Sequence, residues 1–157
     1  MSRKCRASLY FAAPLFSAAE LSFNLKLTAQ LEQFLDVYLP QRDGGKLVDL
    51  VVKKVPVEEA YKSIFDRDME ALNEADALLM VLDGRTVDEG AAFELGIAYS
   101  RGKPCIGLQT DPRRLLPMGN NPMIACALEC VFLDSAGVIL WAKQFINRRL
   151  STMDAID

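Results

Sequence analysis

Residues 75–109 read ADALLMVLDGRTVDEGAAFELGIAYSRGKPCIGLQ, and this segment decides the fold. Its unbroken apolar run at residues 77–82 is typical of a strand buried on both faces. Residues 90–101 follow as a predicted helix that Gly102 ends, and residues 105–108 form a second buried strand. The segment is therefore one strand–helix–strand unit of a parallel sheet, in which ligands bind beyond the carboxyl ends of the strands.

Two capping boxes are predicted at helix starts. In the first, the Thr86 hydroxyl would accept a hydrogen bond from the backbone N–H of Glu89, whose side chain would reach back. Ser17 and Glu20 have the same spacing ahead of an apolar pattern of helical period. We therefore expect a second helix over residues 18–35.

Glu94 is the unusual residue of the predicted central helix, which is otherwise apolar and built to be packed. Gly90 and Ala98, one turn away on the same face, are small and would leave space over the carboxylate for a small molecule. The alternative is a surface glutamate on a polar face, although few other charges on this helix define such a face. A partly desolvated carboxylate has its charged form disfavoured, which is typical of reactive or proton-exchanging groups.

Composition limits the class of protein. With 157 residues, of which 51% are hydrophobic and 25% charged, the chain is expected to form a single globular domain over residues 1–157. A net charge of −3 disfavours nucleic acid and anionic membranes as partners. No apolar run reaches the roughly 18 residues of a membrane span, and no signal-peptide core follows the N-terminus. We therefore expect a cytoplasmic protein.

The chain has no histidine, which excludes Ser-His-Asp and Cys-His catalysis, histidine-ligated zinc and histidine general bases. Acid–base or nucleophilic work must then come from Asp, Glu, Tyr, Lys or Cys. The cysteines do not form a C-x-x-C pair, so we expect no metal site, and buried or half-buried free thiols instead. They are Cys5, Cys105, Cys126 and Cys130.

Strands and helices alternate along the rest of the chain. Further strands are predicted at residues 7–13, 36–40 and 128–133, and further helices at residues 56–73 and 135–150. This alternation predicts an α/β fold with a doubly wound, five-stranded parallel sheet, most simply in flavodoxin-like order. Residues 41–56 are expected to form an excursion with a short helical turn. Residues 110–124 form a long loop, which in a compact domain is usually functional.

The helix over residues 56–73 carries Asp68. Its apolar positions at helical spacing predict that one side packs on the sheet: Val57, Tyr61, Ile64, Phe65, Met69 and Leu72. Asp68 lies off this stripe and could point to the carboxyl edge of the sheet. On spacing alone, a solvated helix residue is the favoured interpretation.

Four segments together resemble the nucleoside 2-deoxyribosyltransferases. They are LYFAAP at 9–14, IFDRDMEALNEADA at 64–77, VDEGAAFELGIAYSRGKP at 87–104 and NPM at 121–123. The third segment is the specific one, and the resemblance covers most of the chain in matching order. It implies small-molecule substrates, 2′-deoxynucleosides and free nucleobases, and no cofactor.

The resemblance implies that Glu94 is the nucleophile. It would attack C1′ of a 2′-deoxynucleoside, expel the base and form a covalent deoxyribosyl ester, which a second base then attacks with overall retention. Departure of the base develops positive charge at C1′, which a nearby carboxylate stabilises and then captures. Without the electron-withdrawing 2′-hydroxyl this cation forms more easily, so a carboxylate suffices without metal or phosphate.

The resemblance implies roles for three further side chains. Tyr10 matches a tyrosine that hydrogen-bonds and orients the nucleophile, the alternative being an ordinary strand aromatic. Asp68 matches an aspartate that contacts the base and handles its proton on departure. Asp88 matches an aspartate that binds the sugar hydroxyls, the alternative being charge compensation at a helix terminus.

Four residues would complete the substrate site. Gln41 lies where the family places a base-contacting side chain, and Phe16 and Met123 would be apolar walls. Asn121 matches an asparagine that a neighbouring subunit donates to the 5′-hydroxyl, so the resemblance implies at least a homodimer. Pro122 departs from the usual aliphatic residue there, and the preference for purine or pyrimidine stays open.

Two other functions remain open. A related 2′-deoxynucleoside 5′-phosphate N-hydrolase uses the same glutamate, but water takes the sugar. Asp88 beside a phosphate dianion would be repulsive, which favours unphosphorylated nucleosides, although Arg113 and Arg114 could compensate. A module that senses nucleosides without turnover is the second alternative, since fold does not imply function.

Overall fold

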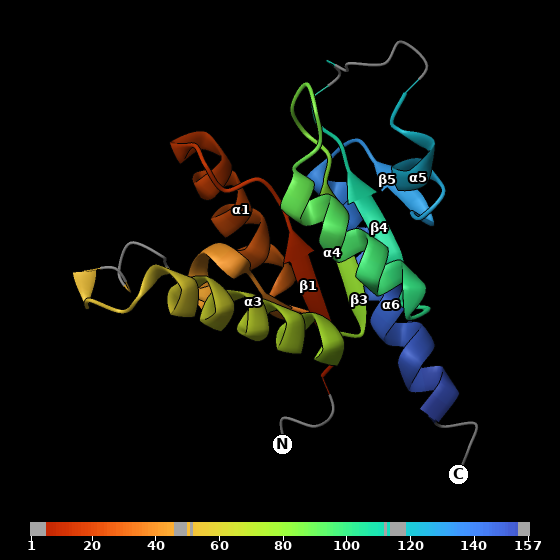
Figure 1. Ribbon diagram of the computed structural model, residues 1–157. Helices are drawn as coiled ribbons and strands as arrows, with labels where there is room; N and C mark the ends of the chain where they lie inside the picture. The colour runs from red at the N-terminus through yellow and green to blue at the C-terminus, as the bar shows by residue number, and fades with distance from the viewer. Residues whose placement is uncertain (1–5, 46–49, 51, 112, 114–118, 154–157) are drawn as a thin grey trace.

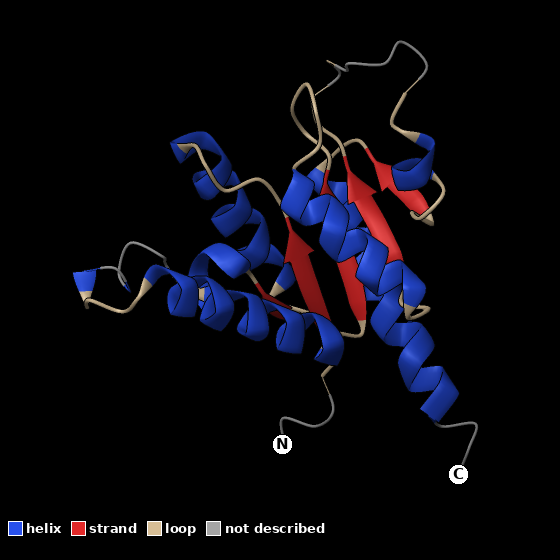
Figure 2. Ribbon diagram, viewed as in Figure 1, coloured by secondary structure: helices blue, strands red, loops and turns tan. Residues whose placement is uncertain are grey.

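The computed structural model describes residues 6–45, 50, 52–111, 113 and 119–153, which form a parallel sheet with helices on both faces (Figures 1 and 2). The strands are β1 (Ser8–Ala12), β2 (Asp36–Tyr38), β3 (Ala77–Val81), β4 (Cys105–Leu108) and β5 (Cys130–Phe132). Their order is β2-β1-β3-β4-β5, and every neighbouring pair is parallel. The predicted doubly wound, flavodoxin-like sheet is confirmed.

Helices cover the sheet in two layers. They are α1 (Ala18–Leu31), η2 (Pro40–Gly44), α3 (Val57–Glu74), α4 (Glu89–Ser100), α5 (Pro122–Ala125) and α6 (Ser135–Met153). One core cluster joins the sheet to α1 and α6, and a second joins its other face to α3 and α4, which lie in front in Figure 1. No helix in the described part of the chain is both long and apolar enough to cross a membrane.

Alternation along β1 assigns its side chains to the two layers. Leu9 and Phe11 belong to the cluster with α1 and α6, whereas Tyr10 belongs to the cluster with α3 and α4. The register of β1 and β2 pairs Tyr10 with Tyr38, so both rings lie on the α3–α4 face. The sheet thereby brings two tyrosines to the layer that carries Glu94.

The two predicted capping boxes had different outcomes. The box at Ser17 and Glu20 is present and begins α1. The box at Thr86 is wrong, because Asp88 is the N-cap of α4 and its side chain accepts from Ala91 N at 2.8 Å. Threonine and aspartate are both good N-caps, so local preference did not separate them.

Other element boundaries moved by a few residues. Helix α1 ends at Leu31 and not near residue 35, because Leu35 instead packs in the core within the turn that leads to β2. The predicted loop at residues 110–124 ends in the short helix α5, and its residues 112 and 114–118 lie outside the described residues. Of the cysteines, Cys105 is buried and Cys130 half-buried as expected, Cys126 is exposed, and Cys5 lies outside the described residues.

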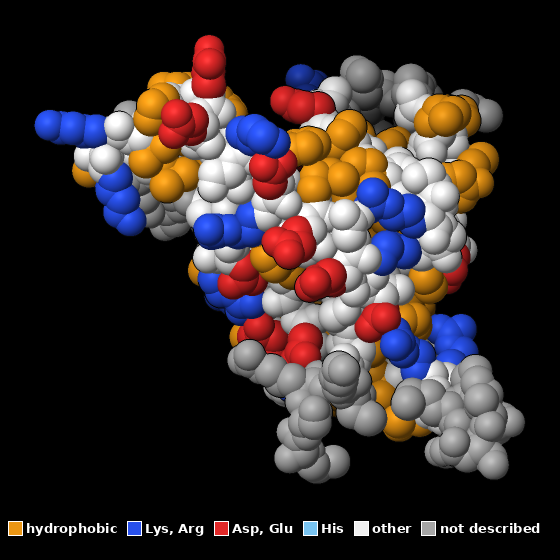
Figure 3. All heavy atoms as spheres, turned by 60° about the horizontal axis from the view of Figure 1, so that its bottom comes forward, with side chains coloured by type: hydrophobic (Ala, Val, Ile, Leu, Met, Phe, Trp, Pro, Cys, Tyr) orange, Lys and Arg blue, Asp and Glu red, His pale blue; other side chains and the backbone are white. Residues whose placement is uncertain are grey.

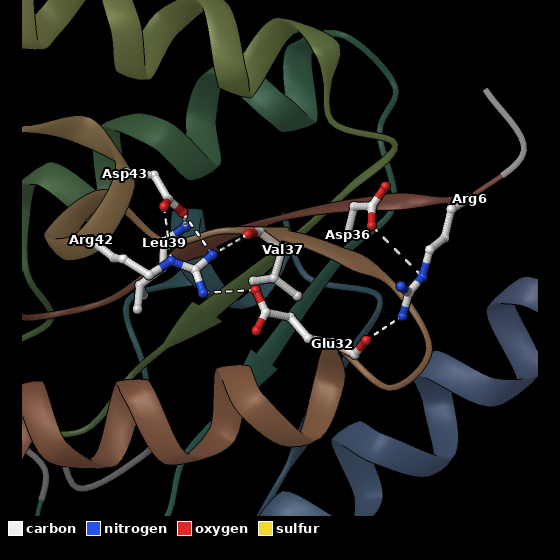
Figure 4. A network of polar contacts seen from close by, with 7 residues as sticks. All are labelled: Arg6, Glu32, Asp36, Val37, Leu39, Arg42 and Asp43. Carbon is white, nitrogen blue, oxygen red and sulfur yellow. Dashed lines mark hydrogen bonds and ion pairs between the residues drawn. The ribbon is translucent and has the colours of Figure 1, made fainter. Parts of the chain in front are cut away.

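The turn η2 follows edge strand β2 and is held by two charged side chains (Figure 4). Asp43 Oδ2 accepts from the backbone N–H of Leu39 at 2.9 Å. Arg42 donates to the backbone oxygen of Val37 at 2.8 Å and pairs with Glu32, the C-cap residue of α1, at 2.7 Å. These bonds fasten η2 to β2 and α1, which fixes the backbone beside Tyr38.

Gly107 in β4 provides a test of the core. A Cβ there would lie 2.9 Å from Leu82 Cδ1, 3.0 Å from Leu128 Cδ1 and 3.1 Å from Val131 Cγ2. Gly107→Ala is therefore expected to overpack this layer and to lower the free energy of unfolding by about 1–3 kcal/mol in urea titration. Gly96→Ala is the matched control, because Gly96 has open space on α4 and alanine favours a helix. An unchanged urea midpoint for Gly107→Ala would contradict the prediction.

Candidate active site

Tyr10 of β1 and Glu94 of α4 form a close pair. The Tyr10 hydroxyl donates to Glu94 Oε1 at 2.6 Å, and the Tyr10 side chain is fully buried. Burial raises the pKa of Glu94 to about 7, and the nearby carboxylates of Asp68 and Asp88 add to the rise. The hydrogen bond from Tyr10 opposes the rise, because it stabilises the charged form. Glu94 is therefore a desolvated carboxylate and not a surface glutamate.

A second tyrosine–carboxylate pair lies beside the first. The Tyr38 hydroxyl donates to Asp68 Oδ1 at 2.8 Å, and the rings of Tyr38 and Tyr10 stack with centroids 5.4 Å apart. Burial raises the pKa of Asp68, while the Tyr38 hydrogen bond and the charge of Arg67 lower it. The solvated position that helical spacing favoured for Asp68 is therefore wrong, because β2 and η2 cover this side of α3.

A cavity of about 170 Å³ connects the two pairs. Its lining residues come from β1, α3 and α4: Tyr10, Phe65, Asp68, Met69, Leu72, Gly90, Phe93 and Glu94. Gly90 thus gives the open space predicted for it, whereas Ala98 is buried in the core. Phe65 and Phe93 are about half exposed, with ring centroids 6.4 Å apart, so each presents part of an aromatic ring to the cavity. The cavity therefore combines acidic groups with apolar and aromatic walls.

Asp88 lies close enough to affect Glu94 and also caps α4. Its Oδ2 accepts from Ala91 N at 2.8 Å. A Cβ at Gly90 would lie 3.1 Å from Asp88 Oδ2, so glycine leaves room for this carboxylate. Within the described residues no donor bonds Asp88 Oδ1. The helix-terminus role is thus observed, and contact with sugar hydroxyls stays a prediction.

The structure engages Gln41 with α1. Gln41 Nε2 donates to Leu21 O at 3.0 Å, and its Oε1 accepts from Asn24 Nδ2 at 2.9 Å. Asn24 also donates to Pro14 O at 2.9 Å, which ties the segment after β1 to η2. Gln41 is not among the residues that line the cavity, so its contact with a base stays a prediction.

Three other predicted residues lie outside the cavity. Phe16 is 80% exposed and Met123 is 81% exposed. Asn121 is the N-cap of α5, and its Oδ1 accepts from Met123 N at 2.9 Å. The roles of these three residues remain predictions.

A larger, open hollow of about 950 Å³ lies along β2 and the amino-terminal ends of the strands. Four of its charged residues form two ion pairs, Arg42 with Glu32 at 2.7 Å and Arg6 with Asp36 at 3.7 Å (Figure 4). Figure 3 shows acidic and basic side chains interspersed over this end of the molecule. In parallel sheets ligands bind at the opposite, carboxyl end of the strands, so the smaller Glu94 cavity is the candidate active site.

The sequence did not identify Tyr38, Phe65 or Phe93 as site residues. Tyr10 and Tyr38 are each the third residue of their strand. The register that places them side by side, however, depends on how the whole sheet assembles. Helical spacing places Phe65 on an apolar stripe, and Phe93 lies in an otherwise apolar helix, so the sequence predicts that both rings pack in the interior. A half-exposed aromatic beside a carboxylate is visible only once α3 and α4 are docked.

Comparisons with known proteins identify the family and support the fold. The fold is similar to the crystal structure of a conserved protein from Enterococcus faecalis V583, with 28% sequence identity and a TM-score of 0.71. The alignment covers 88% of this chain and 98% of that chain. A 2-deoxyribosyltransferase from the psychrotolerant bacterium Bacillus psychrosaccharolyticus shares the fold at 24% identity, covering 85% and 90% of the two chains, with a TM-score of 0.65. No curated protein matches. The family model of nucleoside 2-deoxyribosyltransferases matches residues 9–140, and the chain therefore belongs to this family.

Proposed function

We propose that this protein transfers 2-deoxyribose between nucleobases through a covalent ester on Glu94. The observation that carries the proposal is the 2.6 Å hydrogen bond from Tyr10 to a desolvated Glu94 carboxylate, in a cavity that also contains Asp68. A nucleophile held by a neighbouring group, with a second carboxyl group beside it, suits displacement at an anomeric carbon. The family to which the chain belongs supports the same reaction.

The proposed reaction has two displacements. A Glu94 oxygen forms a bond to C1′, the C1′–N bond breaks, and the base leaves with the bonding electron pair while Asp68 supplies a proton. The nitrogen of a second base then attacks C1′, the ester C–O bond breaks, and Glu94 is released as a carboxylate. The proton of the incoming base returns to Asp68, so the enzyme is regenerated and C1′ keeps its configuration.

The charges around the cavity favour unphosphorylated 2′-deoxynucleosides. The titratable carboxyl groups beside it are Glu94, Asp68 and Asp88, and none of its lining residues is a lysine or an arginine. Arg113, which could have compensated a phosphate, pairs with Asp111 at 2.6 Å, and Arg114 lies outside the described residues. A dianion near these carboxylates would be repelled in a partly dry site.

The proposal includes a homo-oligomer, at least a dimer, in which Asn121 of one subunit reaches the 5′-hydroxyl in the site of another. Asn121 and Met123 are exposed beside each other on α5, as a residue offered to a neighbour must be. Phe16 is equally exposed after β1 and would be an apolar wall. A cytoplasmic location and a role in reusing nucleobases belong to the same proposal.

The test is product chromatography with 2′-deoxyinosine, with and without free adenine. Formation of 2′-deoxyadenosine is expected only when adenine is present. Release of hypoxanthine that adenine does not affect would indicate hydrolysis. Inert 2′-deoxynucleosides, together with inert 5′-phosphates, would leave only the sensing function.

Tyr10→Phe is expected to move the acid limb of the kcat/KM profile to higher pH. Glu94 must be ionised to attack, and the variant loses the hydrogen bond that lowers the pKa of Glu94 from the value set by burial. Each unit of upward shift lowers the rate on the acid side about tenfold. The measurement is kcat/KM for base exchange from pH 5 to 9, with Tyr99→Phe as the exposed control on the same helix as Glu94. An acid limb that stays in place would show that Tyr10 does not act on the ionisation of Glu94.

A further inference from the structure

The Asp68 carboxylate is enclosed on its Oδ1 side by two groups. The Tyr38 hydroxyl donates to Oδ1 at 2.8 Å, and a Cβ at Gly44 would lie 2.5 Å from Oδ1, so only the bare glycine backbone fits there. In the described residues no donor bonds the other oxygen, Oδ2, and Asp68 lines the Glu94 cavity. We propose that Tyr38 is a positioning residue, which with the Gly44 backbone fixes Asp68 so that one carboxyl oxygen is kept for the base. The inference rests on the function proposed above.

Tyr38 is itself held by the sheet. It is the register partner of Tyr10, and the two rings stack with an angle of 22° between their planes. Adjacent strands thus carry parallel phenols, one bonded to the nucleophile and one to Asp68. Because each tyrosine fixes one carboxylate, the spacing of β1 and β2 sets the relative position of Glu94 and Asp68. Tyr38 does not line the cavity, so it acts through Asp68 and not on the substrate.

The position of the Gly44 backbone, the second group beside Asp68, depends on the bonds that hold η2 in place. Asp43 and Arg42 bond the backbone of Leu39 and Val37, and they close η2 against β2 (Figure 4). Arg67, which precedes Asp68 within α3, reaches the same turn and donates to Asp43 O at 3.5 Å. Contacts outside the cavity therefore hold the backbone of Gly44 next to the Asp68 side chain.

Several ionisable groups face Asp68 and must be counted in its titration. They are Tyr10 from β1, Tyr38 from β2, Arg67 from α3 and Glu94 from α4, while Asp43 of η2 acts on Tyr38. Among them the Tyr38 hydrogen bond stabilises the ionised form of Asp68. Its removal is expected to raise the pKa of Asp68 and to free the carboxylate to rotate.

The experiment compares Tyr38→Phe with wild type in base exchange from 2′-deoxyinosine. We expect kcat to fall about 10- to 100-fold with a smaller change in KM, because misplacement of a proton-donating group by about 1 Å costs this much. The limb of the pH profile that disappears in Asp68→Asn is expected to move to higher pH in Tyr38→Phe. ¹³C NMR of labelled aspartate would follow the same rise in the pKa of Asp68 without turnover.

Gly44→Ala is a second variant, because the three atoms nearest to its added methyl group all belong to the Asp68 side chain, and it should also lower kcat. Tyr61→Phe is the control, since Tyr61 is 60% exposed on the same helix as Asp68. An unchanged kcat and an unmoved limb in Tyr38→Phe, with active wild type, would overturn this inference alone. Wild type that cleaves no deoxynucleoside would overturn the proposed function and the inference with it.

Discussion

Glu94→Gln is expected to abolish base exchange in a protein that still folds. Glutamine keeps the size of the side chain and can still accept the Tyr10 hydrogen bond, but its amide oxygen cannot form a stable ester with C1′. Loss of the attacking group should lower kcat on the order of 10⁴-fold or more, since the covalent route and its effective molarity are lost together. The measurement is formation of 2′-deoxyadenosine from 2′-deoxyinosine and adenine.

Glu89→Gln is the matched control for this prediction. Glu89 lies in the first turn of the same helix and is exposed, so the variant should retain exchange. Mass spectrometry of wild type quenched with 2′-deoxyinosine should find one deoxyribosyl group on the peptide that contains Glu94, and none in Glu94→Gln. Exchange by Glu94→Gln at the wild-type rate would exclude the covalent route.

The same variant has an effect on stability that catalysis does not explain. The pKa of Glu94 is about 7 in the folded protein against an ordinary 4.5, so between these values the folded state holds a proton that the unfolded chain has lost. Ionised Glu94 therefore destabilises the fold by up to about 3 kcal/mol above pH 7, and not at all below about pH 4. Glu94→Gln should unfold at a higher temperature than wild type at pH 8, and this difference should disappear toward pH 4.

The part of the fold that could be predicted is the part that local chemistry determines. The apolar run of β3, the glycine after α4 and the apolar run of β4 specify a strand–helix–strand unit without tertiary information. Gly102 has a φ of 68°, a conformation that suits glycine at a helix end. Glu94 could be found because a carboxylate in so apolar a helix requires an explanation.

The sequence did not predict the exposure of α3 or the position of Asp68, because both depend on how the helices pack against the sheet. The spacing of Val57, Tyr61 and Phe65 on α3 predicts burial, yet these residues are 52%, 60% and 51% exposed. Their half of the helix runs beside η2 and beyond the strands, so the sheet does not cover it (Figure 1). Asp68 shows the opposite error, because its place off the apolar stripe faces Tyr38, and only the register of β1 and β2 brings Tyr38 there.

Asp68→Asn is expected to have the second largest effect on catalysis. The proposed reaction needs a proton on the departing base, and an amide cannot supply one. Loss of general acid catalysis typically lowers kcat by about 10²–10⁴-fold. The variant should also lower the pKa of Glu94, because the charge of Asp68 helps to raise it, so the acid limb should move to lower pH.

The leaving group separates this role from a merely structural one. From the deoxyriboside of p-nitrophenol, the leaving group departs as p-nitrophenolate and needs no proton. Asp68→Asn should therefore cleave this substrate at a rate close to that of wild type, while it cleaves 2′-deoxyinosine slowly. Asp66→Asn is the control, since Asp66 is exposed on the same helix and pairs with Lys62 at 2.9 Å. Equal losses on both substrates would mean that Asp68 only holds the cavity in shape. A loss confined to the natural nucleoside would show that Asp68 protonates the departing base. The two carboxylates would then have separate roles: Glu94 bonds to the sugar, and Asp68 supplies the proton.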